Sequence, residues 1–351
     1  MSDERWKQAL LESGGVFDES NATPAHFGDP SAEYRAGRES AALFDVSDRA
    51  QIEVTGEDRA AFLHGFCTND VKSLQPGGGC EAFFTNIKGR VLAHAFLFAA
   101  DDSLWIETVA GAEDGLIAHL DRYLITEDVQ LRARTAEFGE LLVSGPQTLP
   151  AVAAAGFASD LDAPNSHCRT DGVRMRRVDW FDTPGVLLSI ARGDLPAVWR
   201  RLSETQETPP AGATAFHALR IEAEFPLYGM DITEENLAQE VDRNDTAISF
   251  TKGCYLGQEP IARIDALGHV NRLLRGLRIA GGAAPSPGAV ILGPDDEVEI
   301  GRVTSATRLP DGSGAVALAC LRSRYAAAGS AVIVETGGER LNGTVFHGST
   351  A

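Results

Sequence analysis

Residues 51–66 read QIEVTGEDRAAFLHGF and pass from one kind of secondary structure to another. Ile52 and Val54 alternate with polar residues, which predicts a half-buried β-strand. Gly56 ends the alternation, and the two acidic residues after it favour the start of a helix, because carboxylates stabilise a helix N-terminus. A strand that leads directly into a helix indicates a fold that mixes α and β structure.

The region that follows predicts a β-hairpin. The turn-forming sequence QPGGG precedes two apolar runs, Cys80 to Thr85 and Val91 to Ala100, which residues 86–90 (NIKGR) join. Apolar residues at helical spacing over 116–124 and 195–202 predict two amphipathic helices further along the chain.

The tail of the chain predicts a small β-barrel. A linker at residues 280–288 (AGGAAPSPG) combines proline and glycine with few large apolar residues, which predicts a domain boundary. Beyond it, five short β-rich runs recur between turn residues, at 289–292, 298–306, 314–321, 331–335 and 341–346. Five strands at this spacing are typical of a barrel.

The charge of the chain limits its partners. Its 351 residues include 31 basic and 50 acidic side chains, for a formal net charge of −19. Only four of the basic residues are lysines, so 27 are arginines. This combination suggests a salt-rich cytoplasm, where the Debye length falls to about 3 Å. The acidic balance also argues, though weakly, against nucleic acid as a partner.

Membrane and metal-binding classes are disfavoured as well. No apolar run approaches the ~18 residues that span a bilayer, and the first residues do not resemble a signal peptide, so we expect a cytoplasmic protein without membrane contact. The five cysteines are an odd number at wide spacings, which argues against a disulfide framework. No CxxC or HExxH occurs, so we expect no metal site.

The segment KGCYLGQE at residues 252–259 is the strongest candidate for chemistry. The stretch after it predicts a helix, so Cys254 would lie near a helix N-terminus, where the pKa of a thiol is lowered. Lys252 and Arg263 would add positive charge. Lys252 and Lys88 both stand in glycine-flanked turns, which favours a compact ammonium group there. The alternative is that Cys254 is a small buried side chain in a turn.

A second candidate is the segment around Arg220. In the simplest interpretation, Arg220 and Glu222 form an ordinary surface ion pair. If they face a pocket instead, the guanidinium can bind a carboxylate or the edge of a heterocycle, and Phe216 can stack on a flat ligand.

Three parts of the chain carry a resemblance to a known family. They are FDVSDRAQIEVTGEDRAAFLHGFCTNDV from Phe44, ALRIEAEFPLYGMDI from Ala218, and RLLRGLRI, EIGRVTSAT and VALACL in the tail. They resemble the glycine-cleavage T-protein (aminomethyltransferase) superfamily. Within it, ISFTKGCYLGQEPIAR resembles the YgfZ branch, folate-binding proteins implicated in maintaining iron–sulfur enzymes, through the motif K-G-C-[FY]-x-G-Q-E.

The resemblance implies a fold of the α+β class, a three-domain cloverleaf of the T-protein type around a central folate channel. Two interleaved α/β subdomains would form the folate-binding region and a small β-barrel would follow. The expected spans are 1–270 for the folate-binding region (roughly 1–50 with 136–240, and 51–135 with 241–270) and 281–351 for the barrel.

The resemblance also implies tetrahydrofolate, or another reduced folate, as the cofactor. Arg220 matches an arginine that contacts folate in T-proteins, and Phe216 falls where YgfZ proteins have a folate-stacking aromatic residue. We also count Asn86, at the start of the hairpin turn, among the cofactor-binding candidates. Arg49 stands where bacterial YgfZ proteins have a second tryptophan.

The catalytic aspartate of T-proteins has no counterpart here. Their GGxxDD motif corresponds to residues 89–94, which read GRVLAH. The turn at residues 182–185 (DTPG) also lacks the glutamate that binds pterin in T-proteins. We therefore expect little ordinary T-protein activity, although His94 could serve a different one-carbon donor.

The leading hypothesis is a YgfZ-like folate-binding factor that supports iron–sulfur protein assembly or repair. Cys254 and Lys252 are its catalytic candidates, and iron–sulfur clients or assembly proteins are its expected partners. One alternative is a tetrahydrofolate-dependent aminomethyltransferase or methyltransferase. Another is a non-catalytic folate-binding scaffold in which Cys254 is structural.

Overall fold

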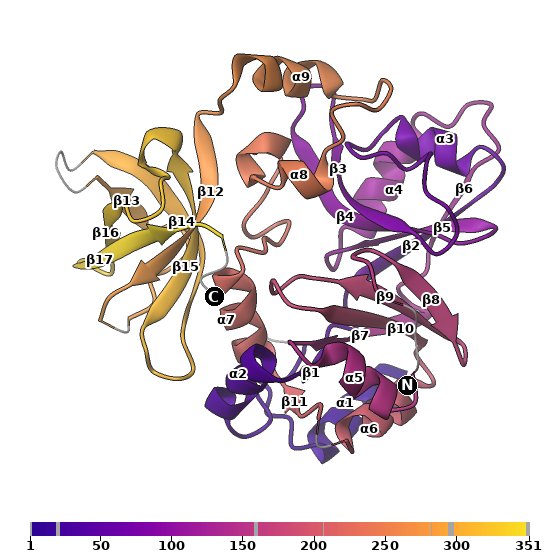
Figure 1. Cartoon of the computed structure of the whole chain (residues 1–351), viewed down its shortest axis with the longest axis horizontal. Coiled ribbons are helices and arrows are strands. Elements are labelled where there is room, and N and C mark those ends of the chain that lie inside the picture. The colour runs from indigo at the N-terminus through magenta and orange to yellow at the C-terminus, as the bar shows by residue number, and fades with distance from the viewer. Residues whose placement is uncertain are drawn as a thin grey trace.

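The computed structural model describes residues 2–18, 22–157, 161–205, 207–281, 283–293 and 298–348. Its strands form two open sheets and one closed barrel. In Figure 1 the two sheets lie one above the other on the right and the barrel lies on the left, with helices and loops of residues 213–270 between them. This architecture confirms the expected α+β class with a C-terminal barrel.

The first sheet has six strands in the order β11-β1-β7-β10-β9-β8. They are β1 (Ala42–Asp45), β7 (Phe138–Ser144), β8 (His167–Thr170), β9 (Val173–Val178), β10 (Gly185–Ala191) and β11 (Pro210–Ala211). One face is covered by α1 (Ser2–Glu12), α5 (Thr148–Ala154) and α6 (Leu195–Ser203). The buried core between sheet and helices includes Trp6, Leu141, Val152 and Trp199.

The second sheet has five strands in the order β3-β4-β5-β2-β6. They are β2 (Ala50–Thr55), β3 (Gly79–Thr85), β4 (Val91–Ala99), β5 (Ser103–Thr108) and β6 (Gln130–Ala133). Two helices, α3 (Arg59–His64) and α4 (Glu113–Asp121), bury Phe62, Leu63, Leu116 and Leu120 against one face. The predicted strand, the helix after it and the hairpin are confirmed by β2, α3 and the pair β3–β4.

The barrel has six strands in the order β12-β15-β14-β13-β16-β17. They are β12 (Arg272–Ile279), β13 (Val290–Leu292), β14 (Glu299–Arg308), β15 (Ala315–Arg322), β16 (Ala331–Thr336) and β17 (Glu339–Phe346), and a one-turn 3-10 helix, η2 (Ser323–Tyr325), follows β15. The expected number of five strands is wrong, because β12 pairs with both β15 and β17 and closes the barrel. Leu277 and Ile279 of β12 belong to the barrel core, so the barrel begins at β12, ahead of the boundary expected at 280–288.

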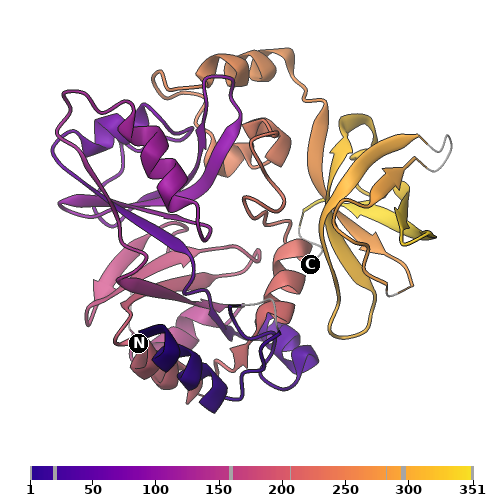
Figure 2. The same ribbon diagram turned by 180° about the vertical axis from the view of Figure 1, so that it is seen from behind.

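The described residues contain five further helices: α2 (Pro30–Glu39), α7 (Ala213–Glu222), the 3-10 helix η1 (Ala238–Val241), α8 (Asn244–Ala247) and α9 (Gln258–Leu267). The helix α7 contacts α2, β14 and β15, and Figure 2 shows it between the barrel and the first sheet. A central core joins α7 to both sheets and the barrel through Phe96, Trp180, Ile221 and Leu318.

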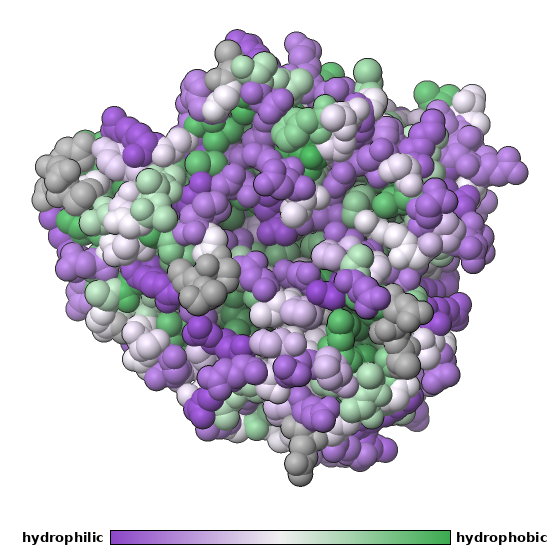
Figure 3. All heavy atoms as spheres, viewed as in Figure 1, coloured by the Kyte–Doolittle hydropathy of each residue, from purple (hydrophilic) through white to green (hydrophobic). Residues whose placement is uncertain are grey.

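The surface agrees with the acidic, polar composition. In Figure 3 hydrophilic residues predominate on the face seen in Figure 1, with apolar residues scattered among them. Among the helices of the described ranges, none is both long enough and apolar enough to cross a membrane.

Candidate functional site

Two cavities lie near the middle of the molecule. The larger, with a volume of about 740 Å³, is bordered by β3, the β9–β10 turn and the start of the barrel, and its lining includes Glu81, Phe96, Arg177, Trp180, Asp182, Thr183, Arg243 and Arg275. The smaller, of about 410 Å³, is bordered by β1 and α7, and its lining includes Phe44, Arg49, Phe216, His217, Tyr228 and Met230. The two cavities share no lining residue.

One wall of the larger cavity is aromatic. Trp180 stacks on Phe225, with ring centroids 5.2 Å apart and planes inclined by 17°, and Phe96 packs against both rings. The indole Nε1 of Trp180 and the hydroxyl of Thr183 are buried and have no hydrogen-bond partner among the described residues. Buried donors are normally satisfied by water or a ligand, so this wall fits a flat, polar molecule.

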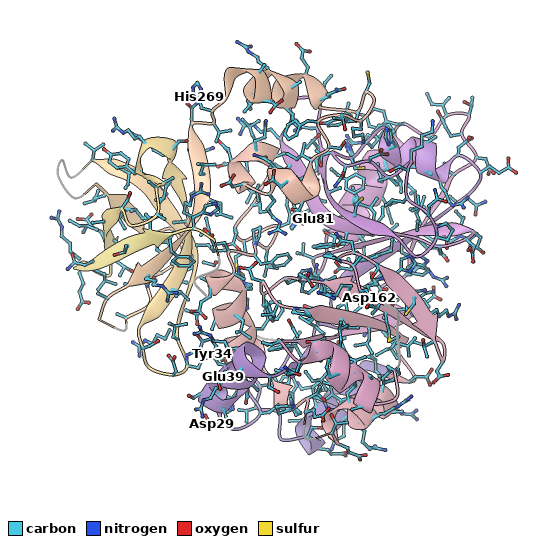
Figure 4. The ribbon with its side chains drawn as sticks, in the orientation of Figure 1. Asp29, Tyr34, Glu39, Glu81, Asp162 and His269 are labelled. Carbon is cyan, nitrogen blue, oxygen red and sulfur yellow. The ribbon has the colours of Figure 1, made fainter. Side chains whose placement is uncertain are left out.

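Glu81 of β3 brings a buried carboxylate to the same cavity, near the middle of the molecule in Figure 4. His94 Nε2 lies 2.6 Å from its Oε1, and Arg243 binds both of its oxygens, with Nη2 2.8 Å from Oε2. Burial alone would raise the pKa of Glu81, but the charge of Arg243 and the hydrogen bonds from His94 and Arg243 outweigh it and hold that pKa well below its usual range. Glu81 is therefore an anion at neutral pH, and His94 donates to it through Nε2.

His94 is the last residue of the segment 89–94, which lacks the expected catalytic aspartate, and it faces the inside of the molecule. Alternate residues of a strand point to opposite faces. Ala93 thus packs into the outer core of the second sheet, while His94 faces the centre between Phe83 and Phe225. In the register of the hairpin His94 lies opposite Phe83, so Glu81 reaches it diagonally from the neighbouring strand. The carboxylate at this site therefore comes from β3 and not from β4.

Phe216 of α7 lies in the wall of the smaller cavity, together with Phe44, His217 and Arg49. The guanidinium carbon of Arg49 is 4.4 Å from the centroid of the Trp180 ring. Because Trp180 lines the larger cavity and Arg49 the smaller one, this cation–π contact lies between the two cavities.

Arg220 is fully buried and lines neither cavity. Its guanidinium donates to the Asp231 carboxylate at 2.8 Å, to His217 Nδ1 at 2.9 Å and to the Phe225 carbonyl. Burial and the charge of Arg220 lower the pKa of His217 to about 4, so that ring is neutral and carries its proton on Nε2. The structure gives Arg220 a positioning role, because it fixes His217 and the segment 225–231 beside the smaller cavity.

Lys252 and Cys254 lie outside both cavities. Lys252 is buried, and its ammonium donates to the carbonyls of His64, Cys67 and Asn69 at 2.6 to 2.8 Å. These three carbonyls belong to the end of α3 and the segment after it, so Lys252 attaches its own loop to the second sheet. Cys254 is exposed on that loop, ahead of α9. The predicted helix after Cys254 is confirmed.

Asn86 packs against the loop of Cys254 and lines neither cavity. Its side-chain oxygen accepts from the amides of Lys88 and Arg90 and so closes the β3–β4 turn. The Thr85 hydroxyl donates to the Leu256 carbonyl at 2.8 Å, which ties the hairpin to the loop. The structure thus brings together Asn86, Lys252 and Cys254 in one region and Phe216 and Arg220 in another.

The sequence analysis did not identify Glu81, Arg243 or Trp180. A signal for Glu81 was available, because an acid inside the apolar run Cys80 to Thr85 must find a partner if it is buried. Its partner Arg243 is 162 residues away in the chain, so no local pattern links them. Across the described residues, no three His, Cys, Asp or Glu side chains cluster in a way that could hold a metal ion.

Comparisons with known proteins agree with this architecture. Residues 8–250 match the GCVT N-terminal domain, and residues 272–349 match the glycine cleavage T-protein C-terminal barrel domain. An aminomethyltransferase of Frankia alni is 30% identical over 315 residues, which cover 88% of this chain and 85% of that protein. A chloroplast protein of Arabidopsis thaliana, named as a transferase, is 26% identical over 350 residues, or 98% of this chain and 78% of that protein.

The fold also matches a solved structure. The glycine cleavage system aminomethyltransferase T from Bartonella henselae superposes with a TM-score of 0.89 at 21% identity, over 99% of this chain and 97% of that one. The chain is thus a three-part protein with a central pair of cavities and a C-terminal barrel. It belongs to the glycine-cleavage T-protein family, whose named relatives include aminomethyltransferases.

Proposed function

We propose that this chain binds a reduced folate in the larger cavity and transfers a one-carbon unit with it. The observation that carries the proposal is the Trp180–Phe225 stack with two unsatisfied buried donors beside it. The lining supplies aromatic faces for the flat ring of a folate and the Asp182 carboxylate for its ring amino groups.

Calorimetric titration with tetrahydrofolate tests this assignment. Trp180→Ala should weaken binding at least tenfold, because it removes the stacking surface and one donor. Phe216→Ala is the matched variant in the smaller cavity, where the resemblance placed the folate-stacking aromatic residue. If only Phe216→Ala weakens binding, the folate occupies the smaller cavity. If neither wild type nor variants bind any reduced folate, the cofactor assignment is wrong.

In the transfer itself, His94 is the proposed proton-handling group. His94 does not line the cavity itself but connects to it through Glu81, whose carboxylate accepts a hydrogen bond from His94 Nε2 and is bound by Arg243. A bound reduced folate would supply the nitrogen that accepts the one-carbon unit. The aminomethyltransferases among the relatives support this reaction class.

Release of ammonia from an aminomethylated lipoyl carrier measures this activity. His94→Asn should lower the rate by about 10² to 10⁴, the usual contribution of general acid–base catalysis. His119→Asn is the control, since His119 is also buried but belongs to α4 on the outer face of the second sheet. If the folded, folate-loaded protein releases no ammonia, an aminomethylated carrier is excluded as the one-carbon donor.

A second candidate function is that of a YgfZ-type factor for iron–sulfur proteins in the cytoplasm. The exposure of Cys254, on a loop held by the three hydrogen bonds of Lys252, favours it. In a deletion strain, loss of iron–sulfur enzyme activities without loss of glycine-dependent growth would support this function. Cys254→Ser should then fail to complement the deletion, whereas full complementation would assign Cys254 a structural role.

A further inference from the structure

A third cavity lies apart from the two central ones. It has a volume of about 410 Å³ and lies between the β4–β5 turn and the edge hairpin β8–β9. Its lining includes Trp105, His167, Arg169, Arg174 and Arg176, and none of its lining residues borders either central cavity.

Basic side chains face one another across the hairpin that forms this cavity. In the register of β8 and β9, Arg169 lies opposite Arg174 and His167 lies opposite Arg176. Arg169 and Arg174 are like charges directly opposite each other, which is destabilising, whereas burial lowers the pKa of His167 and favours its neutral form. The lining of this cavity combines three arginines with three acidic residues, Glu53, Asp101 and Asp102.

The deepest guanidinium nitrogens have unused hydrogen-bonding capacity. Arg176 is only 1% exposed and its Nη1 donates to Glu140 Oε1 at 2.6 Å, but its Nη2 has no partner among the described residues. Arg174 has a buried Nη1 that likewise lacks a partner within the described ranges, and its guanidinium carbon lies 3.7 Å from the Trp105 ring centroid. Unpaired buried donors on a charged group are costly, so their persistence calls for an acceptor.

The electrostatics point in the same direction. Burial, together with the charges of Arg176 and Arg169, lowers the pKa of Arg174 to about 10. Glu140, which pairs with Arg176, has a raised pKa because it is buried and lies beside Glu107, and it contacts only Nη1 of the Arg176 guanidinium. A negative charge in the cavity would relieve the repulsion between these arginines.

Acidic side chains also line the cavity, and one of them, Glu53, lies close enough to Arg174 to act on its pKa. Glu53 is paired with Arg134 at 3.5 Å, and Asp101 and Asp102 are exposed in the β4–β5 turn. The arginines with unpaired nitrogens are therefore at the buried end and two of the three acids at the exposed end. This distribution admits a compact anion to the arginines and disfavours a long polyanion.

We propose that this third cavity is a binding site for a small oxyanion, the phosphate or carboxylate group of a metabolite, held by Arg174 and Arg176 next to Trp105. The site is separate from the proposed folate site and does not depend on it.

Calorimetry and thermal unfolding with two minimal probes, inorganic phosphate and succinate, test the proposal on the full chain at constant ionic strength in potassium chloride. Saturable binding of either probe and a rise in Tm are expected, and the tighter probe identifies the group. Arg174→Gln should weaken binding at least tenfold, because it removes one of the two guanidinium groups that hold the anion. The substitution leaves the Arg176–Glu140 pair intact. Arg324→Gln is the matched control, because Arg324 also stacks on an aromatic ring but belongs to the barrel.

Several outcomes would overturn the proposal. If neither phosphate nor succinate binds more tightly than chloride, water alone satisfies the unpaired nitrogens of Arg174 and Arg176. Equal binding by wild type and Arg174→Gln would place the anion elsewhere. Competition between phosphate and tetrahydrofolate would assign the arginines to the folate, whereas independent binding of the two supports a separate site.

Discussion

Glu81, His94 and Arg243 act as one electrostatic unit at the residue scale. Each of the three is paired in the folded protein, and Glu81 is the member on which the other two converge. The pKa of Glu81 in the folded protein lies below its ordinary value of 4.5. Its ionisation therefore stabilises the fold fully above about pH 4.5, and this contribution is lost as the pH falls below that value.

Replacing Glu81 by Gln should lower the free energy of unfolding at pH 7 by about 3 kcal/mol, because it leaves the partly buried Arg243 charge unpaired. The loss of stability between pH 5 and pH 3 should also become less steep than in wild type. Urea unfolding across this pH range measures both effects. Glu335→Gln is the control, since its pair with Arg340 is half-exposed and worth under about 1 kcal/mol. An unchanged acid limb in Glu81→Gln would contradict the pKa assignment.

Cysteine reactivity is a second prediction at this scale. Cys67 and Cys80 are buried and their pKa values are raised by that burial, and burial also raises the pKa of Cys320 to about 11. Cys254 is exposed. Iodoacetamide followed by peptide mass spectrometry should therefore label Cys254 first in the folded protein. Preferential labelling of another cysteine would show that the loop does not present its thiol.

At the scale of elements, Gly257 joins the hairpin β3–β4 to the loop of Cys254. It is the N-cap of α9 with a φ of 83°, and an added Cβ would lie 2.4 Å from the Asn86 carbonyl oxygen. Gly268, at the other end of α9, has a similar φ of 77° but no atom within 4 Å of such a Cβ. The two glycines therefore share the backbone strain but not the steric contact.

Gly257→Ala should accordingly cost more stability than Gly268→Ala. The left-handed backbone costs roughly 1 to 2 kcal/mol at either position, and displacement of the hairpin adds roughly 1 to 3 kcal/mol at Gly257 alone. Chemical denaturation of the two variants gives the difference. The labelling rate of Cys254 should change in Gly257→Ala only. Equal destabilisation by both substitutions would show that the hairpin does not depend on this contact.

Local patterns predicted those elements whose periodicity is strong. The alternation at Ile52 and Val54 and the two apolar runs of the hairpin were sufficient for β2, β3 and β4. The strand β12 was missed as a strand because arginines and Gly276 interrupt its apolar pattern. A glycine is needed at position 276 because a Cβ there would lie 2.1 Å from the Phe346 ring. Phe346 is distant in the sequence, so no local pattern reveals this contact.

The candidate site was less predictable than the fold. Phe216 was placed in a cavity wall by resemblance, but Trp180 and Glu81 meet only because the two sheets face a common centre. Arg220 appeared suited to a ligand by its residue type, yet the carboxylate of Asp231 and the carbonyl of Phe225 use its donors. Side chains brought together by tertiary packing leave no trace in sequence spacing.

At the scale of the whole molecule, the net charge of −19 should make stability depend on ionic strength. Repulsion among acidic side chains opposes the compact state, and added salt screens it. Thermal unfolding should therefore show Tm rising between 0.05 M and 1 M potassium chloride. Sodium chloride should have a similar effect at equal ionic strength, and sucrose at equal osmolality separates screening from solvent exclusion. A Tm that falls with salt would contradict this prediction.

Only residues 268–271 separate α9 from β12. The helix α9 begins directly after the loop of Cys254, and β12 is built into the barrel on both of its edges. Four extended residues span at most about 14 Å, so the connection limits how far the barrel and α9 can separate. Any ligand or partner that draws the barrel further away than this reach would pull on α9 and shift the position at which the Cys254 thiol meets solvent, even though it touches neither the loop nor the hairpin.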